Sequence, residues 1–217
     1  MKKTMFVALL AGLVLSTATV FAADCCKCKP LFGKDLANAD YDAAVWSVDE
    51  NGELFAVRDS VIWTKEKFGD CKISFEYKLS AHANAGLLIQ CSDRNNWIPN
   101  TIEIQLLDDF GTEANYHGNG SFYGYQAPTK VATKPAGEWN KMVVTIKGRT
   151  IVVEVNGEKI NEIDTAQWTD AKKSPAGTDI EGKFQGKSLA EADPVGYIGL
   201  QGLHGQSPVK YRNLTIE

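Results

Sequence analysis

The stretch Cys71-Lys72-Ile73-Ser74-Phe75-Glu76-Tyr77-Lys78-Leu79 alternates apolar and polar residues along its whole length. Successive side chains of a β-strand point to opposite sides, so the alternation gathers its apolar side chains on one face: Ile73, Phe75, Tyr77 and Leu79. Helical periodicity is nearly absent from the rest of the chain. The pattern therefore predicts a sheet with one apolar face, which a second layer must cover.

More strands are expected on the C-terminal side of this stretch, at 86–91, 101–107, 141–146, 151–155, 158–163, 196–201 and 210–216. Asn156-Gly157 separates two of them, and this dipeptide between β-rich runs is the strongest short signal for a hairpin. Together they predict an all-β fold, an antiparallel β-sandwich in which two sheets pack face to face.

Two stretches between the strands are irregular. Residues 109–129 are rich in Gly, Asn, Tyr and His and are too long for a simple connection, which makes them a candidate functional loop. Residues 165–194 carry many Gly, Lys and Asp residues, and a short helix is expected around 188–192.

The N-terminus has the order of a secretory signal peptide. Lys2 and Lys3 precede an apolar run that ends in small residues, which predicts cleavage after Ala22 or Ala23. A retained membrane anchor and a lipoprotein acylated at Cys25 are the alternatives, but Asp24 is a poor residue to precede an acylated cysteine. We expect a signal peptide over 1–23, a Cys-rich segment over 24–30 and one domain over 31–217, located in the periplasm or outside the cell.

Charge and cysteine content restrict the partners. Removing Lys2 and Lys3 leaves 21 basic against 27 acidic residues, so the mature chain has no electrostatic reason to bind nucleic acid or an anionic membrane. No later segment is long and apolar enough to span a bilayer. The five cysteines are an odd number, and no spaced zinc motif is present. If 71–80 and 85–93 form a hairpin, Cys71 and Cys91 fall on opposite faces, which argues against a bridge between them.

The strand at 101–107 carries the most suggestive polar face. Ile102, Ile104 and Leu106 point one way, whereas Glu103 and Gln105 point the other. An ordinary solvated face is the plain alternative. However, the aromatic, Gly-rich loop follows at once, and carboxylates, amides and aromatic faces together are the groups that bind sugars. The candidate substrate-binding residues are Asn84, Gln90, Trp97, Gln105, Asp108, Tyr123 and Gln201, and the candidate catalytic residues are Glu103 and His204.

An ordered series of motifs resembles the bacterial 3-keto-disaccharide hydrolase domain family over nearly the entire mature chain. The series begins at Leu31-Phe32-Gly33-Lys34-Asp35-Leu36 and continues through Asn84-Ala85-Gly86 and Ile102-Glu103-Ile104-Gln105-Leu106-Leu107-Asp108 to Tyr211-Arg212-Asn213-Leu214. One departure concerns Gln201-Gly202-Leu203-His204-Gly205, which lacks the Asp that the family carries beside its histidine. The sequence thus offers no adjacent carboxylate for His204.

The resemblance implies a concanavalin A-like jelly roll and cleavage of glycosides already oxidised to a ketone at C3, with a carbohydrate or 3-keto-glycoside as partner. It implies Glu103 and His204 as acid and base in either order, without a cofactor or catalytic metal, although a structural calcium ion is compatible with the fold. A non-catalytic, lectin-like binding module is the alternative from another class, because a fold alone does not imply catalysis. A small structural protein cross-linked through its N-terminal cysteines is the third.

Overall fold

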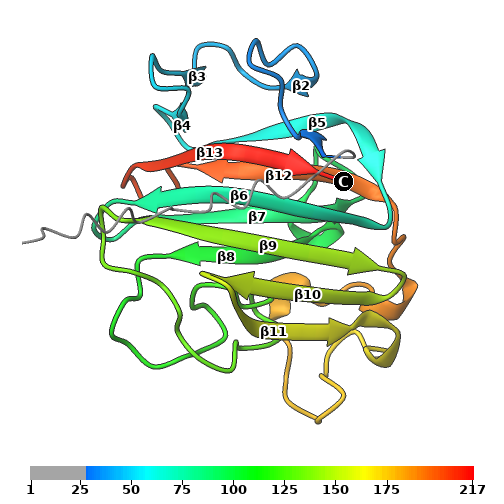
Figure 1. The fold of residues 1–217 in the computed structure, drawn as a ribbon. Helices are drawn as coiled ribbons and strands as arrows, with labels where there is room; N and C mark the ends of the chain where they lie inside the picture. Colours follow the sequence, from blue (N-terminus) through cyan, green and yellow to red (C-terminus); the bar gives the residue numbers. More distant parts are fainter. Residues whose placement is uncertain (1–27) are drawn as a thin grey trace, which may run out of the picture.

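The computed structural model describes residues 28–217, whose strands form two antiparallel sheets packed face to face (Figure 1). The larger sheet runs in the order β11 (Glu158–Asp164), β10 (Thr150–Val155), β9 (Trp139–Lys147), β6 (Cys71–Leu79), β13 (Val209–Ile216), β4 (Leu54–Ala56) and β3 (Trp46–Val48), with β1 (Lys29–Pro30) beside β13. The smaller sheet runs β2 (Ala39–Asp40), β5 (Ser60–Phe68), β12 (Gly196–Gly202), β7 (Asn84–Cys91) and β8 (Ile102–Leu107). Short 3-10 turns lie at η1 (Ile98–Asn100), η2 (Thr165–Gln167), η3 (Gly182–Phe184) and η4 (Leu189–Glu191).

The structure confirms the all-β sandwich and contains every strand expected from the alternation. The strand over residues 71–79 has the predicted bounds, and the others differ from prediction by at most two residues at an end. Asn156 and Gly157 both have positive φ, at 54° and 84°, and Val155 pairs with Glu158 across the turn. Positive φ at both central residues is what a type I′ hairpin turn requires. The helix expected around residue 188 is the single 3-10 turn η4.

The hairpin considered for residues 71–93 does not form. β6 pairs with β9 and β13 in the larger sheet, whereas β7 pairs with β12 and β8 in the smaller one. The turn between β6 and β7 therefore crosses from one sheet to the other. Cys71 and Cys91 are both buried and free, in different sheets.

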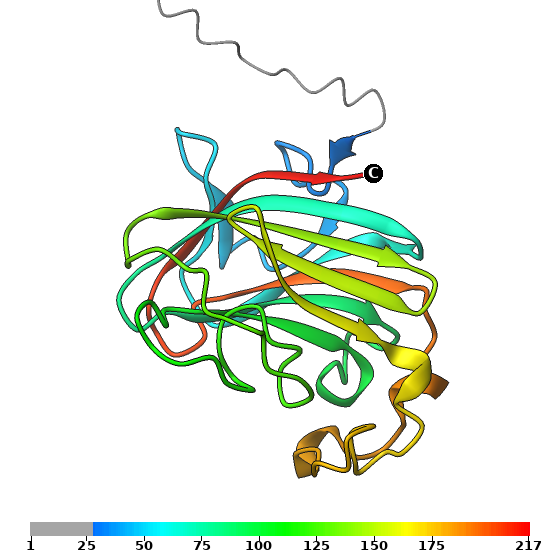
Figure 2. The same cartoon turned by 60° about the horizontal axis from the view of Figure 1, so that its bottom comes forward.

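One core cluster lies between the sheets and takes residues from Leu31 to Ile216 (Figure 2). Tyr211 of β13 is fully buried there, and its hydroxyl donates a 2.6 Å hydrogen bond across the core to the backbone carbonyl of Gln201 on β12. A buried carbonyl without a donor is costly, so this bond fixes β12 to the larger sheet.

Buried polar contacts hold the long loop after β8 in place. The Asp109 carboxylate accepts 2.7 Å and 2.8 Å hydrogen bonds from the Asn119 backbone N–H and the Thr133 hydroxyl. The Tyr77 hydroxyl donates to the Asn119 side chain at 3.0 Å. The loop is therefore attached to the core by buried hydrogen bonds.

Several expectations lie outside the described residues: the signal peptide, its cleavage site and most of the Cys-rich segment. Within 28–217, no helix has the length and apolar character needed to cross a membrane.

The contact between Tyr211 and Gln201 gives a prediction for stability. Tyr211→Phe keeps the ring but leaves the Gln201 carbonyl without its donor, so we expect a loss of about 1–3 kcal/mol in the free energy of unfolding measured with urea. Tyr116→Phe, at an exposed tyrosine, is the control and should change that free energy by less than about 0.5 kcal/mol. Equal stability of the two variants would contradict a role for this bond.

Candidate active site

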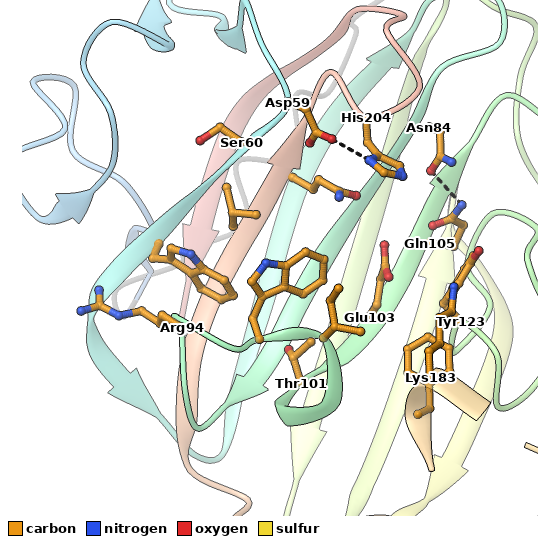
Figure 3. A pocket seen from close by; sticks show the side chains of 16 residues that line it. Asp59, Ser60, Asn84, Arg94, Thr101, Glu103, Gln105, Tyr123, Lys183 and His204 are labelled. Atoms are coloured by element: carbon orange, nitrogen blue, oxygen red, sulfur yellow. Dashed lines mark hydrogen bonds and ion pairs between the residues drawn. The ribbon is translucent and has the colours of Figure 1, made fainter. Parts of the chain in front are cut away.

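A cavity of about 570 Å³ lies on the face of the smaller sheet that points away from the core (Figure 3). The alternation of β8 produces it, because Ile102, Ile104 and Leu106 are buried in the core while Glu103 and Gln105 line the cavity. The volume is in the range typical of small-molecule sites. Of the predicted site residues, the structure brings seven together around this cavity: Asn84, Trp97, Glu103, Gln105, Tyr123, Gln201 and His204.

Glu103 points into the cavity between Thr101 and His204 (Figure 3). Its side chain passes close over Gly86 of β7. A Cβ atom at Gly86 would lie 2.3 Å from Glu103 Oε1, so only glycine leaves room for this conformation. The carboxylate makes no hydrogen bond or ion pair with any residue of 28–217. Burial raises the pKa of Glu103 to about 7, against smaller opposing effects of His204 and Lys183. Glu103 is therefore poised to hold or release a proton near neutral pH.

His204 has a carboxylate partner that the sequence did not reveal. Its Nδ1 lies 2.8 Å from Asp59 Oδ2, in the segment just before β5 and 145 residues away along the chain. Because an ionised carboxylate only accepts, Nδ1 carries a proton, and in the neutral imidazole Nε2 then keeps its lone pair. Figure 3 shows the second ring nitrogen turned away from Asp59 and toward the cavity. The Asp missing beside the histidine in sequence is thus replaced in space by Asp59.

Amide side chains form the rest of the polar wall. Gln105 is 2% exposed and donates a 3.1 Å hydrogen bond to Asn84 Oδ1, while its own oxygen has no partner among the described residues. Gln201 is 5% exposed and lines the cavity, and its amide makes no hydrogen bond within residues 28–217. Buried polar groups normally have partners, so the free amide of Gln201 fits a group that waits for a ligand.

The loop after β8 places Tyr123 beside Glu103. The Tyr123 N–H donates to the Glu103 carbonyl at 2.9 Å and the Gly120 N–H to the Gln105 carbonyl at 2.8 Å, while the Ser121 carbonyl accepts from the Gln105 N–H at 3.1 Å. This pairing covers the free edge of β8. The Tyr123 ring stands 4.8 Å from the His117 ring and 4.5 Å below Lys183 Nζ, which also lines the cavity from η3.

Two predicted site residues lie elsewhere. Gln90 donates to the Pro194 carbonyl at 3.3 Å and lines a separate cavity of about 170 Å³ beyond η1. Asp108 accepts a 2.9 Å hydrogen bond from the His82 N–H and does not line the main cavity. The paired carboxylates Glu103 and Asp108 therefore do not face one another across this cavity.

Nine of the sixteen residues that line the cavity were not among the candidates, and Asp59, Trp63 and Lys183 are three of them. Asp59 and Trp63 belong to the N-terminal part of the chain, where no strand was predicted. Lys183 lies in an irregular segment without periodicity, so its approach to the site depends wholly on tertiary packing. Within 28–217, no group of three His, Cys, Asp or Glu side chains is arranged to hold a metal ion.

Comparisons with known proteins give a family match and structural neighbours. Residues 27–217 match the family model described as the 3-keto-alpha-glucoside-1,2-lyase-like domain. The chain is similar to a candidate glycosyl hydrolase from Parabacteroides distasonis ATCC 8503, with 40% identity and a TM-score of 0.84 over 88% of this chain and 98% of that one. A search of curated proteins found no match.

More distant structures share the fold alone. A second candidate glycosyl hydrolase from the same Parabacteroides strain has 20% identity and a TM-score of 0.68, with 87% of this chain and 92% of that one covered. The carbohydrate-binding module CBM66 from Bacillus subtilis has 11% identity and a TM-score of 0.51, with 83% and 95% covered.

The raised pKa of Glu103 makes a prediction for stability against pH. Between pH 4.5 and about 7 the native state holds a proton that the unfolded state has released, so ionisation of Glu103 destabilises the fold as the pH rises. Glu103→Gln should therefore gain stability relative to the wild type from pH 5 to pH 8.5, by on the order of 2 kcal/mol. A difference between the two proteins that stays constant over this range would contradict the raised pKa.

The close passage over Gly86 gives a second prediction. Gly86→Ala should push the Glu103 carboxylate off β7 toward solvent, because the new methyl group would occupy its place. The pKa of Glu103, followed by 13C NMR, should fall below about 7, since burial is the main cause of its rise. Gly186→Ala is the control, because a Cβ there meets nothing within 4 Å. An unchanged Glu103 titration in Gly86→Ala would disprove the steric argument.

Proposed function

The chain belongs to the 3-keto-alpha-glucoside-1,2-lyase-like domain family, and from that premise we propose that it cleaves 3-keto-glycosides by elimination followed by hydration. The observation that carries the proposal is the pair of proton-transfer groups in one cavity: Glu103, partly buried and unpaired with a pKa raised to about 7, and His204, oriented by Asp59.

The substrate's own chemistry defines what the site must supply. A ketone at C3 acidifies the proton on C2, so a base can remove that proton while the C1–O bond breaks. The C2–H electron pair then becomes the C1=C2 bond, and the departing oxygen takes a proton from an acid. Water afterwards adds its oxygen to C1 and a proton to C2. The reaction needs one base, one acid and donors for the ketone oxygen.

We assign the base to His204. The hydrogen bond from Nδ1 to Asp59 fixes the tautomer and leaves Nε2 as an acceptor facing the cavity. Asp59 is a positioning residue, since it orients the ring and stabilises the imidazolium that forms when Nε2 takes the C2 proton.

We assign the acid to Glu103. A carboxyl group kept protonated near neutral pH by burial is suited to deliver a proton to a leaving alkoxide. Gln201 and Asn84 supply amide groups for the ketone and the hydroxyls, and the Tyr123 ring covers the sugar. Gln105 holds Asn84 in position through the hydrogen bond between their side chains.

The assignment predicts how activity depends on the leaving group. Glu103→Gln should lose about 10²- to 10⁴-fold in kcat on a 3-keto-glycoside with an alkyl aglycone, but far less on one with a nitrophenyl aglycone, which leaves without protonation. His204→Ala should lose activity on both, because both need the C2 proton removed. Wild-type kcat should fall above about pH 7 on the alkyl substrate.

The control is Gln126→Glu, a change outside this cavity, which should leave both turnovers within twofold of wild type. Equal losses of kcat for Glu103→Gln on both substrates would contradict the role of Glu103 as the acid. Binding of 3-keto-glycosides without any turnover would favour the non-catalytic carbohydrate-binding module.

We further propose that the protein is exported to the periplasm or beyond and loses residues 1–22 or 1–23. Mass spectrometry of the protein from its native host should then find Ala23 or Asp24 at the N-terminus. A mass that includes Met1 would contradict cleavage.

A further inference from the structure

The cavity is divided into a polar half and an apolar half. The polar half holds His204, Asn84, Gln105, Gln201 and Glu103. The apolar half is lined by Trp63, Trp97, Val61 and Ile98. Trp97 and Val61 pack against the cluster that contains Trp63, and Arg94 lies across the cavity from Tyr123 and Lys183 (Figure 3).

Trp63 belongs to β5, and Trp97, which directly precedes η1, is half-buried against the cluster that contains Trp63. Trp63 is 7% exposed, and its ring lies against Gly199 of β12, where a Cβ atom would come within 2.6 Å of Trp63 Cε3. Trp63, Leu88 and Cys91 form a second hydrophobic cluster, separate from the core, against which Val61, Trp97 and Tyr197 pack. A sheet face that carries such a cluster toward a cavity is a preformed apolar platform.

Two polar side chains beside this platform, those of Thr101 and Arg94, are already engaged. The Thr101 hydroxyl donates to the Ile89 carbonyl at 2.9 Å. The Arg94 guanidinium pairs with Asp40 at 2.9 Å, donates to the Thr64 carbonyl at 3.4 Å and stacks 4.3 Å from the Tyr197 ring. In contrast, Gln201 and Glu103 in the polar half have no partner within 28–217. A second sugar needs free hydrogen-bonding groups for its hydroxyls, and this half offers few.

We propose that the Trp63–Trp97 platform is an aglycone subsite that takes a planar, apolar aglycone, so that the preferred substrates are aryl glycosides rather than disaccharides. The inference rests on the proposed function, because it places the oxidised sugar in the polar half. Glu103 then lies at the boundary of the two halves, where the bond to the aglycone breaks. A planar aromatic ring against two indoles buries more apolar surface than a sugar ring, whose hydroxyls would also need hydrogen-bonding partners.

The preference is tested by the ratio of wild-type to variant kcat/KM, measured separately on an aryl glycoside and on a disaccharide. Trp97→Ala should lower kcat/KM by about 10- to 100-fold on a phenyl 3-keto-glucoside. The fold-loss of kcat/KM on a 3-keto-disaccharide should be smaller by a factor of about 10 or more. Because each ratio compares wild type with variant on one substrate, differences in leaving-group chemistry cancel. Trp139→Ala, on the larger sheet and outside the cavity, should leave both values unchanged. Equal losses on the two substrates would overturn the proposal.

A binding measurement separates this inference from the proposed reaction. Phenyl and methyl thioglucosides, neither oxidised nor cleavable, should bind with about a 10-fold difference in Kd in favour of the phenyl compound, detected by calorimetry and by a change in tryptophan fluorescence. Trp97→Ala should remove that difference. This result would support the subsite even if no 3-keto-glycoside were cleaved. Equal Kd values for the two compounds would overturn it even if 3-keto-disaccharides were cleaved.

Discussion

The close approach of the Glu103 side chain to the backbone of Gly86 is the constraint on which the site depends. The two residues lie on neighbouring strands of the smaller sheet, and the 2.3 Å that would separate a Cβ from Oε1 shows that no other residue at 86 permits this position. Lying against the sheet removes the carboxylate from much of its solvent, which raises its pKa to about 7. The pairing of β7 with β8 therefore yields a carboxyl group that can gain or lose a proton near neutral pH.

The same alternation that builds the core builds the site. Ile102, Ile104 and Leu106 of β8 are buried between the sheets, whereas Glu103 and Gln105 face the cavity. The core then supports the site directly, since Tyr211 reaches across it to the carbonyl of Gln201. The loop after β8 adds to this support, because its backbone bonds fix Tyr123 beside Glu103 while Asp109, buried under Asn119 and Thr133, anchors it.

Sequence patterns predicted the strands from residue 71 onward but none of β1 to β5, and seven of the nine candidate residues line the cavity. Period-two alternation fixes which side chains share a face, so Glu103 and Gln105 could be paired from the sequence. Asp59 could not be found, since its contact with His204 spans 145 residues and no periodic pattern links them. The hairpin considered for residues 71–93 was wrong for a related reason: the short turn between the strands carries no signal that the chain changes sheets there. Gln90 lies in β7 and Asp108 directly follows β8, so both are close in sequence to site residues. Their side chains instead form hydrogen bonds with the Pro194 carbonyl and the His82 N–H, away from the cavity.

The central claim is that cleavage begins with removal of the C2 proton, and the fate of that hydrogen tests it most directly. A 3-keto-glucoside carrying deuterium at C2 should be cleaved with a primary isotope effect on kcat, and the released 3-keto-sugar should have lost its deuterium to water while uncleaved substrate retains it. Release of a sugar that keeps its C2 deuterium, with no isotope effect on kcat, would show direct hydrolysis at C1 and contradict the roles given to His204 and Glu103.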